Sequence, residues 1–309
     1  MIDGSIFQQA GYKNGKGGKS LRLHLCYNLT DGKMESVVLT DNTVAEAVSI
    51  FPVESGALYI ADAGYGKGTQ YLHITQRQAD ALLRVTPNHL RLAEDDKGCA
   101  KIDMVKKLDT SAKLLDFKCF VHTHNGKYAP VRIIASRLPQ DKALLARKRK
   151  LRKASKRQSQ IRKETLVYAE WVILMTSLGD DYTAEELLKM YRCRWQIELL
   201  FKRIKQSLKV TKLRPASLEH SKVTVLMMLI LWAITEKQVL AAELLLLEKD
   251  ADMSLYSNWA TSSFCFQKLK AAFGVIVSCL GDTLNLQALE RLFSHRSHRA
   301  DLGHALSFG

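Results

Sequence analysis

The sequence lacks paired cysteines and long hydrophobic runs, and both absences narrow the class of protein. Its six cysteines form no C-x-x-C pair and show no metal-ligand spacing, so we expect reduced thiols, mostly in the core. The longest apolar run, Val223–Ile234, has 12 residues, which is too short to cross a bilayer and predicts a buried helix. No signal peptide is recognisable. We therefore expect a cytoplasmic protein with no membrane partner.

Acidic residues are also scarce relative to basic ones. The 309 residues include 46 Lys and Arg against 31 Asp and Glu, which gives a net charge of +15. Such an excess indicates a polyanionic partner, with nucleic acid ahead of an anionic membrane. The segment 147–163 holds ten Lys and Arg in 17 residues and no acid. It is either a mobile, solvated face or a contact to the DNA backbone that reads no sequence, with Arg149 and Arg152 as candidate contacts.

Alternating and continuous apolar patterns predict strands in the first 60 residues. Ser20–Asn28 alternates apolar and polar residues, and Met34–Thr40 follows after an Asp-Gly turn. We expect a short helix over Thr43–Ile50. Ala57–Ala61 is a continuous apolar run, which is typical of a strand covered on both faces.

Asp62 follows that apolar run and opens a glycine-rich stretch, 62–68. The stretch lacks the G-x-x-x-x-G-K-[ST] order, so it is not a phosphate-binding loop of that kind. We interpret it as a strand end that presents a carboxylate, followed by a turn in which glycines let another backbone come close. By spacing alone, Asp62 could equally be an ordinary turn residue.

Thr183–Lys209 contains no Gly or Pro and predicts one long helix, with Asp181 or Thr183 as its N-cap. Projected at about 100° per residue, four of its polar residues fall within an arc of roughly 60°. They are Tyr191, Arg194, Glu198 and Lys205. The arc is either a solvated stripe with i,i+4 pairing, or a carboxylate for a divalent metal beside groups that contact phosphates.

These four residues fit Y-x2-R-x3-E-x6-K without a gap, and the string YRCRWQIELLFKRIK resembles the signature of bacterial insertion-sequence transposases of the DDE class, in the insertion-sequence-four group. The resemblance implies an Asp-Asp-Glu metal triad, here Asp3, Asp62 and Glu198, that holds Mg²⁺ or Mn²⁺. It also implies phosphate contacts from Tyr191, Arg194, Lys205 and Lys202. The implied partners are double-stranded DNA, as element ends and target, and a second protomer on the DNA, in the bacterial cytoplasm and nucleoid.

The resemblance also implies an α/β fold: a ribonuclease-H-like core with a β-rich insertion and a helical C-terminal region. We expect Asp3 and Asp62 on neighbouring strands. The domain boundaries that follow are 1–94 for the first part of the core, 95–176 for the insertion with the basic segment, 177–215 for the catalytic helix and 216–309 for the helical region. Predicted insertion strands are Ile102–Leu108, Phe117–Thr123, Val131–Ser136 and Thr165–Thr176, and predicted C-terminal helices are His220–Lys249 and Ser262–Leu280.

The position of the first acid departs from the family pattern. Asp3 has almost no strand before it, and the family carries a DNA-end-binding region upstream. We therefore expect a truncated reading frame or a misassigned start. The alternatives to a transposase are a non-catalytic, DNA-binding remnant and a ribonuclease-H-type nuclease without end specificity. His122 and His124 lie on one face of a predicted strand and, without a third ligand, are interpreted as ordinary strand residues.

Overall fold

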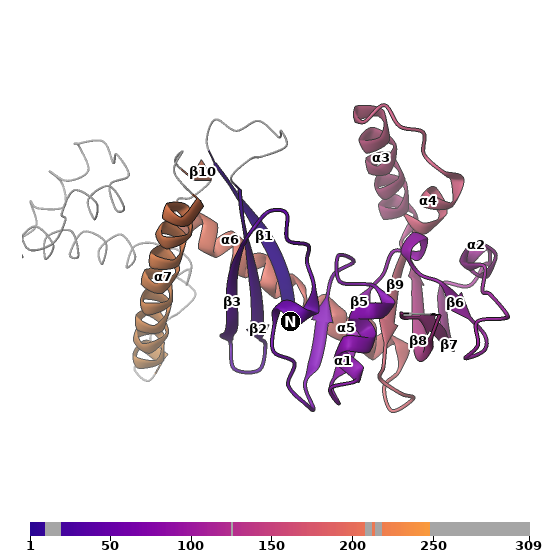
Figure 1. The fold of residues 1–309 in the computed structure, drawn as a ribbon, viewed down its shortest axis with the longest axis horizontal. Helices are drawn as coiled ribbons and strands as arrows, with labels where there is room; N and C mark the ends of the chain where they lie inside the picture. The colour runs from indigo at the N-terminus through magenta and orange to yellow at the C-terminus, as the bar shows by residue number, and fades with distance from the viewer. Residues whose placement is uncertain (10–19, 125, 208–211, 214–217, 248–309) are drawn as a thin grey trace, which may run out of the picture. The chain divides into compact units, whose positions relative to one another are not determined.

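The computed structural model describes residues 1–9, 20–124, 126–207, 212–213 and 218–247. It has a mixed α/β fold, as expected for a ribonuclease-H-like core (Figure 1). The chain forms two compact units. The first comprises residues 1–6 and 22–199, and the second comprises residues 7–21 and 200–309.

The N-terminal strands form a four-stranded sheet in the order β10-β1-β2-β3. The strands β2 and β3 confirm the predicted strands, and the turn between them includes Gly32 at a φ of 65°. The fourth strand, β10, pairs parallel to the end of β1 at Gln8 and Gln9. The bounds are Ile2–Gln9 for β1, Leu21–Asn28 for β2, Lys33–Asp41 for β3 and Lys212–Leu213 for β10.

The other strands form a six-stranded sheet in the order β4-β5-β9-β8-β7-β6. Only the β4–β5 pair is parallel. Strands expected in the core and strands expected in the insertion therefore share one sheet. The bounds are Leu58–Ala61 for β4, Asp80–Arg84 for β5, Leu92–Ala93 for β6, Leu114–His122 for β7, Tyr128–Arg137 for β8 and Trp171–Thr176 for β9.

One hydrophobic core joins both sheets in the first unit. Ile2 and Cys26 belong to the same buried cluster as Leu83 and Ile133, so water is excluded from both sheets together. The helix α1 packs against β5 (Figure 1). The helices are α1 Gly68–Thr75, α2 Met104–Leu108, α3 Gln140–Lys156, α4 Lys163–Tyr168, α5 Ala184–Arg192, α6 Trp195–Ser207 and α7 Leu218–Leu247, with 3₁₀ turns η1 Val48–Ile50 and η2 Pro87–His89.

The glycine-rich turn after β4 has the predicted role. A Cβ on Gly66 would lie less than 3.0 Å from the carbonyl oxygen of Arg84 on β5. A Cβ on Gly68 would come equally close to the carbonyl oxygen of His122 on β7. Only glycine permits these approaches between backbones, so the turn that follows Asp62 lies directly against the sheet.

Three predicted elements are wrong in part, and in two of them an aspartate side chain directs the backbone differently. In Thr43–Ile50 only η1 is helical, since the Asp41 carboxylate accepts from the backbone N–H of Thr43 (2.8 Å) in a turn. Ile102–Leu108 is not a strand: Asp103 caps α2 through the N–H groups of Val105 and Lys106. The predicted strand Thr165–Thr176 begins as the helix α4, and only β9 is extended.

The predicted helix Thr183–Lys209 is two helices, α5 and α6, which are interrupted at Cys193 and Arg194. Here the N–H groups bond back three residues instead of four: Arg194 to Tyr191 at 3.0 Å and Ile197 to Arg194 at 3.2 Å. Such a 3₁₀-type turn advances about 120° per residue. The single-helix projection of the four polar residues therefore does not hold across the interruption.

The predicted C-terminal helix His220–Lys249 corresponds to α7, and its apolar residues from Val223 to Ile234 are buried on one face only. Val225 and Trp232 are buried, while Val223 and Ile230 are more than half exposed. Among the described residues, no helix combines the length and apolarity that a membrane span requires. The other predicted helix, Ser262–Leu280, lies outside the described residues.

Candidate active site

Asp3 is the second residue of β1 and is almost completely buried, next to the fully buried Ile2. Its carboxylate accepts from the N–H of Gly4 at 2.7 Å. Burial raises the pKa of Asp3 to about 7, and the charges of Asp62 and Glu46 act in the same direction. The Gly4 hydrogen bond and Arg194 act against this rise. Such a shift is typical of carboxyl groups in functional sites, although structural groups also show it.

Asp62 directly follows β4, as predicted, and its carboxylate accepts from the N–H of Gly64 at 2.8 Å. The prediction of neighbouring strands is wrong, because β1 and β4 belong to different sheets. β1 pairs with β10 and β2 instead, so both of its edges are occupied. The Glu46 side chain lies close to both acids: a Cβ on Gly4 would be 2.8 Å from one of its oxygens, and a Cβ on Gly64 would be less than 3.0 Å from the other. The charges of Asp3 and Asp62 also interact.

Arg194 connects the first acid with the third. Its guanidinium lies 3.6 Å from Asp3 and forms a hydrogen-bonded ion pair with Glu198, four residues later. It also lies over the ring of Tyr191, with 5.8 Å from Cζ to the ring centroid. Tyr191 itself is buried, and burial raises the pKa of its hydroxyl. The described contacts therefore bring together Asp3, Arg194, Glu198 and Tyr191.

The helix α5 is positioned by a complete capping box. The Thr183 hydroxyl accepts from the N–H of Glu186 at 3.3 Å, and the Glu186 carboxylate accepts from the N–H of Thr183 at 2.8 Å. Leu187 and Tyr191 bury one face of the helix. The cap and this buried face together fix the position of α5. Arg194 lies in the turn directly after this helix.

Lys202 and Lys205 follow Glu198 on α6, within the second compact unit. Lys202 is exposed, whereas Lys205 is half-buried with its ammonium 5.3 Å from the ring centroid of Phe7 in the same unit. Burial lowers the pKa of Lys205. Both lysines remain predicted phosphate contacts.

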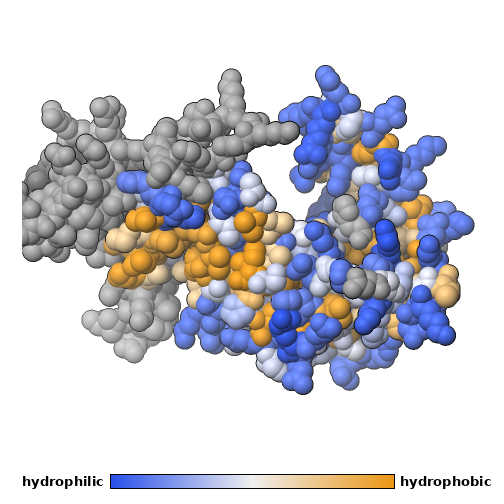
Figure 2. All heavy atoms as spheres, in the orientation of Figure 1, coloured by the Kyte–Doolittle hydropathy of each residue, from blue (hydrophilic) through white to orange (hydrophobic). Residues whose placement is uncertain are grey.

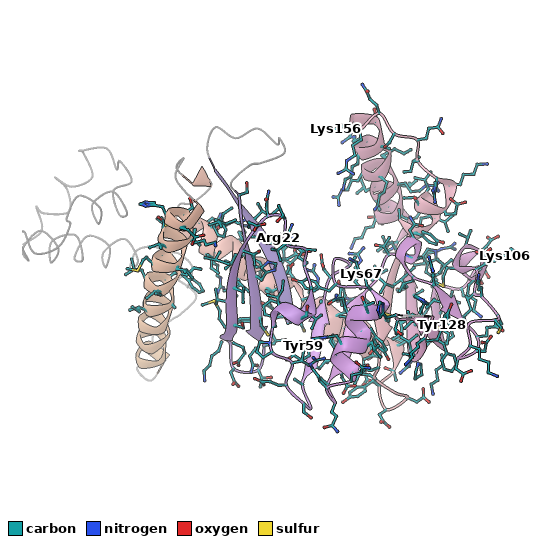
Figure 3. The ribbon with its side chains drawn as sticks, viewed as in Figure 1. Arg22, Tyr59, Lys67, Lys106, Tyr128 and Lys156 are labelled. Atoms are coloured by element: carbon teal, nitrogen blue, oxygen red, sulfur yellow. The ribbon has the colours of Figure 1, made fainter. Side chains whose placement is uncertain are left out.

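Arg149 and Arg152 are exposed on α3, the helix formed by most of the basic segment. In this helix only Ala143 is buried. Figure 2 shows that the side chains around α3 are mostly hydrophilic, and Figure 3 shows Lys156 at the far end of the helix. Residues 147–156 of the basic segment are thus helical, and apart from Arg147, which pairs with Glu170, their cations are presented to solvent.

Glu46 is a residue that sequence reasoning missed. It lies in the irregular segment before η1, where no periodicity and no motif marks it. Within the described residues, no three Asp, Glu, His or Cys side chains converge on one position that would hold a metal ion. The donor set near Asp3 nevertheless suits a hard divalent cation, since it consists of carboxylate oxygens of which Asp3 is buried.

Comparisons with known proteins agree with this chemistry. Residues 2–234 match the family described as "Transposase DDE domain". Similar curated proteins include the "Putative transposase InsL for insertion sequence element IS186A" of Escherichia coli (strain K12) and the "Transposase for insertion sequence element IS421" of Escherichia coli. Each is 31% identical over 228 residues, which cover 72% of this chain and 60% of the relative. The chain thus spans 60% of the length of these relatives. No solved structure matches.

Proposed function

The chain belongs to the DDE transposase family, and from this premise we propose that it catalyses metal-dependent cleavage of DNA phosphodiesters and strand transfer at the ends of an insertion sequence. In this proposal Asp3, Asp62 and Glu198 hold Mg²⁺ or Mn²⁺. A divalent cation bound by carboxylates supplies activation of a water or 3′-hydroxyl and stabilisation of the leaving oxygen. The single observation that carries the proposal is the meeting of Asp3 and Glu198 on one guanidinium.

Arg194 has a specific role in this proposal. A guanidinium binds carboxylates and phosphates with the same fork of N–H donors. Between Asp3 and Glu198 it neutralises negative charge at the position where the two acids meet. When the acids bind a cation, Arg194 can donate to a DNA phosphate instead. Lys202 and Lys205 then contact further phosphates. The interrupted helix supports this role, because the tight turn holds Arg194 between α5 and α6.

The helix α3 is proposed to bind the DNA backbone without reading sequence. The helix contains eight Lys and Arg residues and one acid, Asp141, and Arg149 and Arg152 are exposed. Contacts of this kind position a duplex and depend steeply on salt. Strand transfer joins two element ends to a target, so we propose that two protomers act together on double-stranded DNA.

The test uses the full chain with a supercoiled plasmid that carries an insertion-sequence end, in Mg²⁺ or Mn²⁺. Glu198→Gln should abolish nicking and strand transfer and should leave the affinity for DNA within a few-fold, because only one carboxylate oxygen changes. Glu185→Gln is the matched control, since Glu185 is exposed on α5. Cleavage by the Glu198 variant at the wild-type rate would refute the proposed triad.

A further inference from the structure

The carboxylate of Glu46 occupies the space between the two aspartates. A Cβ on Gly4, next to Asp3, would be 2.8 Å from Oε1 of Glu46, and the three atoms nearest to it all belong to Glu46. A Cβ on Gly64, two residues after Asp62, would come closer than 3.0 Å to Oε2. Both glycines thus leave room for this one side chain. Asp62 and Glu46 interact electrostatically, as do Asp3 and Glu46.

The segment around Glu46 is fixed on both sides. Before it, Nη1 of Arg22 on β2 donates to the carbonyl oxygen of Val44 at 2.7 Å (Arg22 is labelled in Figure 3). After it, the N–H of the fully buried Val48 donates to Oε1 of Gln70 on α1 at 2.6 Å. Glu46 is therefore held in place by contacts of its segment with β2 and with α1, although the segment itself is irregular.

The carboxylate of Glu46 has no direct partner in the fold. Its side chain is half-buried, and among the described residues it makes no hydrogen bond or ion pair. A partly desolvated, unpaired carboxylate beside two others costs free energy through burial and like-charge repulsion. The charge of Arg22 opposes these effects, but burial and the charge of Asp62 outweigh it, so the pKa of Glu46 stays raised.

A second, independent observation indicates a missing partner at the same place. The side chain of Tyr65 is completely buried, and its hydroxyl has no hydrogen-bond partner among the described residues. That hydroxyl interacts electrostatically with Glu46, Asp3 and Asp62, the three acids around it. Buried hydroxyl groups are rarely left without a partner, so the unpaired one among these acids indicates a ligand or its water shell.

We propose that Glu46 is a fourth acidic residue of the site and binds the divalent cation together with Asp3 and Asp62. The inference rests on the proposed function, because it assumes that the two aspartates bind that cation. Oxygen donors and several negative charges are what Mg²⁺ and Mn²⁺ require. The unpaired charge of Glu46 is then neutralised by the ion that it helps to hold.

The experiment measures the dissociation constant of Mn²⁺ for the full chain without DNA, by calorimetry and by electron paramagnetic resonance. Glu46→Gln should weaken binding by at least about ten-fold, and Asp62→Asn should do the same. Glu54→Gln, an exposed carboxylate eight residues later, is the control and should bind as the wild type does. Gly4→Ala places a methyl group against the Glu46 side chain and should reproduce the loss, with no further loss in the double variant.

Thermal unfolding in EDTA separates binding from a structural role. Glu46→Gln should keep or raise the melting temperature without metal, because it removes like-charge repulsion, and should reduce the increase that Mn²⁺ produces. A lower melting temperature in EDTA together with wild-type Mn²⁺ affinity would overturn the inference. So would loss of binding in Asp62→Asn but not in Glu46→Gln, which would leave the proposed function standing. A wild-type chain that binds no Mn²⁺ would refute the metal site itself, and the role of Glu46 with it.

Discussion

At the scale of single residues, Arg194 and Glu46 differ in how many oppositely charged partners they contact. Arg194 is a cation with two carboxylate partners, Asp3 and Glu198, whereas Glu46 is an anion without one among the described residues. The site thus gives Asp3 and Glu198 a direct cationic partner, whereas Glu46 has only the longer-range charge of Arg22. In the metal site proposed above, the cation supplies the direct counter-charge that Glu46 lacks.

The first residue-scale prediction concerns Arg194. Arg194→Ala should lower the free energy of unfolding in EDTA by about 1–3 kcal/mol, because it leaves the buried carboxylate of Asp3 and the partly buried one of Glu198 without their charged partner. Urea unfolding measures this. Arg192→Ala, an exposed arginine on the preceding helix, should change the value by less than about 0.5 kcal/mol. Equal effects of the two changes would show that the Arg194 contacts do not stabilise the fold.

The second residue-scale prediction concerns pH. His24 is completely buried and shares a 2.9 Å hydrogen bond with Thr40, and burial, then the charge of Arg22, lowers its pKa. The unfolded chain therefore takes up the proton first, at about pH 6.5. Its contribution to stability should be complete above that pH and should fall as the pH drops toward the lower pKa of the folded state.

The measurement is urea unfolding at several pH values between about 5 and 8. Against the wild type, His24→Gln should remove part of the decrease in stability below about pH 6.5, at most about 1.4 kcal/mol per pH unit. Because the comparison subtracts all other titrating groups, parallel curves for the two proteins would contradict a lowered pKa at His24.

At the scale of elements, the end of α5 decides where Arg194 lies. The capping box at Thr183 starts the helix, and the tight turn at Cys193 and Arg194 ends it. The cap was predictable, because Thr183 and Glu186 have the required spacing. The turn was not, because neither glycine nor proline marks it, so sequence reasoning extended one helix through it.

The cap gives an element-scale prediction. Thr183→Ala should lower the free energy of unfolding by about 1 kcal/mol, since the Glu186 N–H loses its acceptor and the reciprocal bond weakens. Urea unfolding again measures the change. Glu185→Gln, in the same first turn but without a described side-chain hydrogen bond, should remain within about 0.5 kcal/mol of the wild type. A loss as large in the control would mean that helix charge, instead of the cap, is the cause.

The helix α3 gives the other element-scale prediction. The double change Arg149→Gln and Arg152→Gln should weaken binding of double-stranded DNA and reduce the slope of log affinity against log salt by about 2, if each arginine neutralises one phosphate. Filter binding or fluorescence anisotropy at several salt concentrations measures the slope. Lys97→Gln with Lys101→Gln, two exposed cations in the loop 94–101, is the charge-matched control. Identical slopes for both double variants would exclude a specific role for α3.

At the scale of the whole molecule, the local patterns were sufficient for β2, β3, β4, β7 and β8, because each has an apolar alternation or run of its own. The sheet order was not accessible in this way, since pairing of β5 with β9 depends on residues about 90 positions apart. Glu46 was missed for the same reason: only the tertiary fold brings its segment between Asp3 and Asp62. The family resemblance identified Asp3, Asp62 and Glu198 as candidates, and the structure identified Glu46 beside the two aspartates.

Gly66 and Gly68, two of the three glycines in the loop after Asp62, have a consequence for how this chain can vary. Gly66 and Gly68 lie against the carbonyl groups of Arg84 and His122, so at these two positions the loop approaches the sheet through its main chain. The position of Asp62 therefore depends on these two approaches as well as on the buried side chain of Tyr65 in the same loop. A single methyl group at either glycine would lift the loop and carry that acid away with it, although no side chain of the site had been altered.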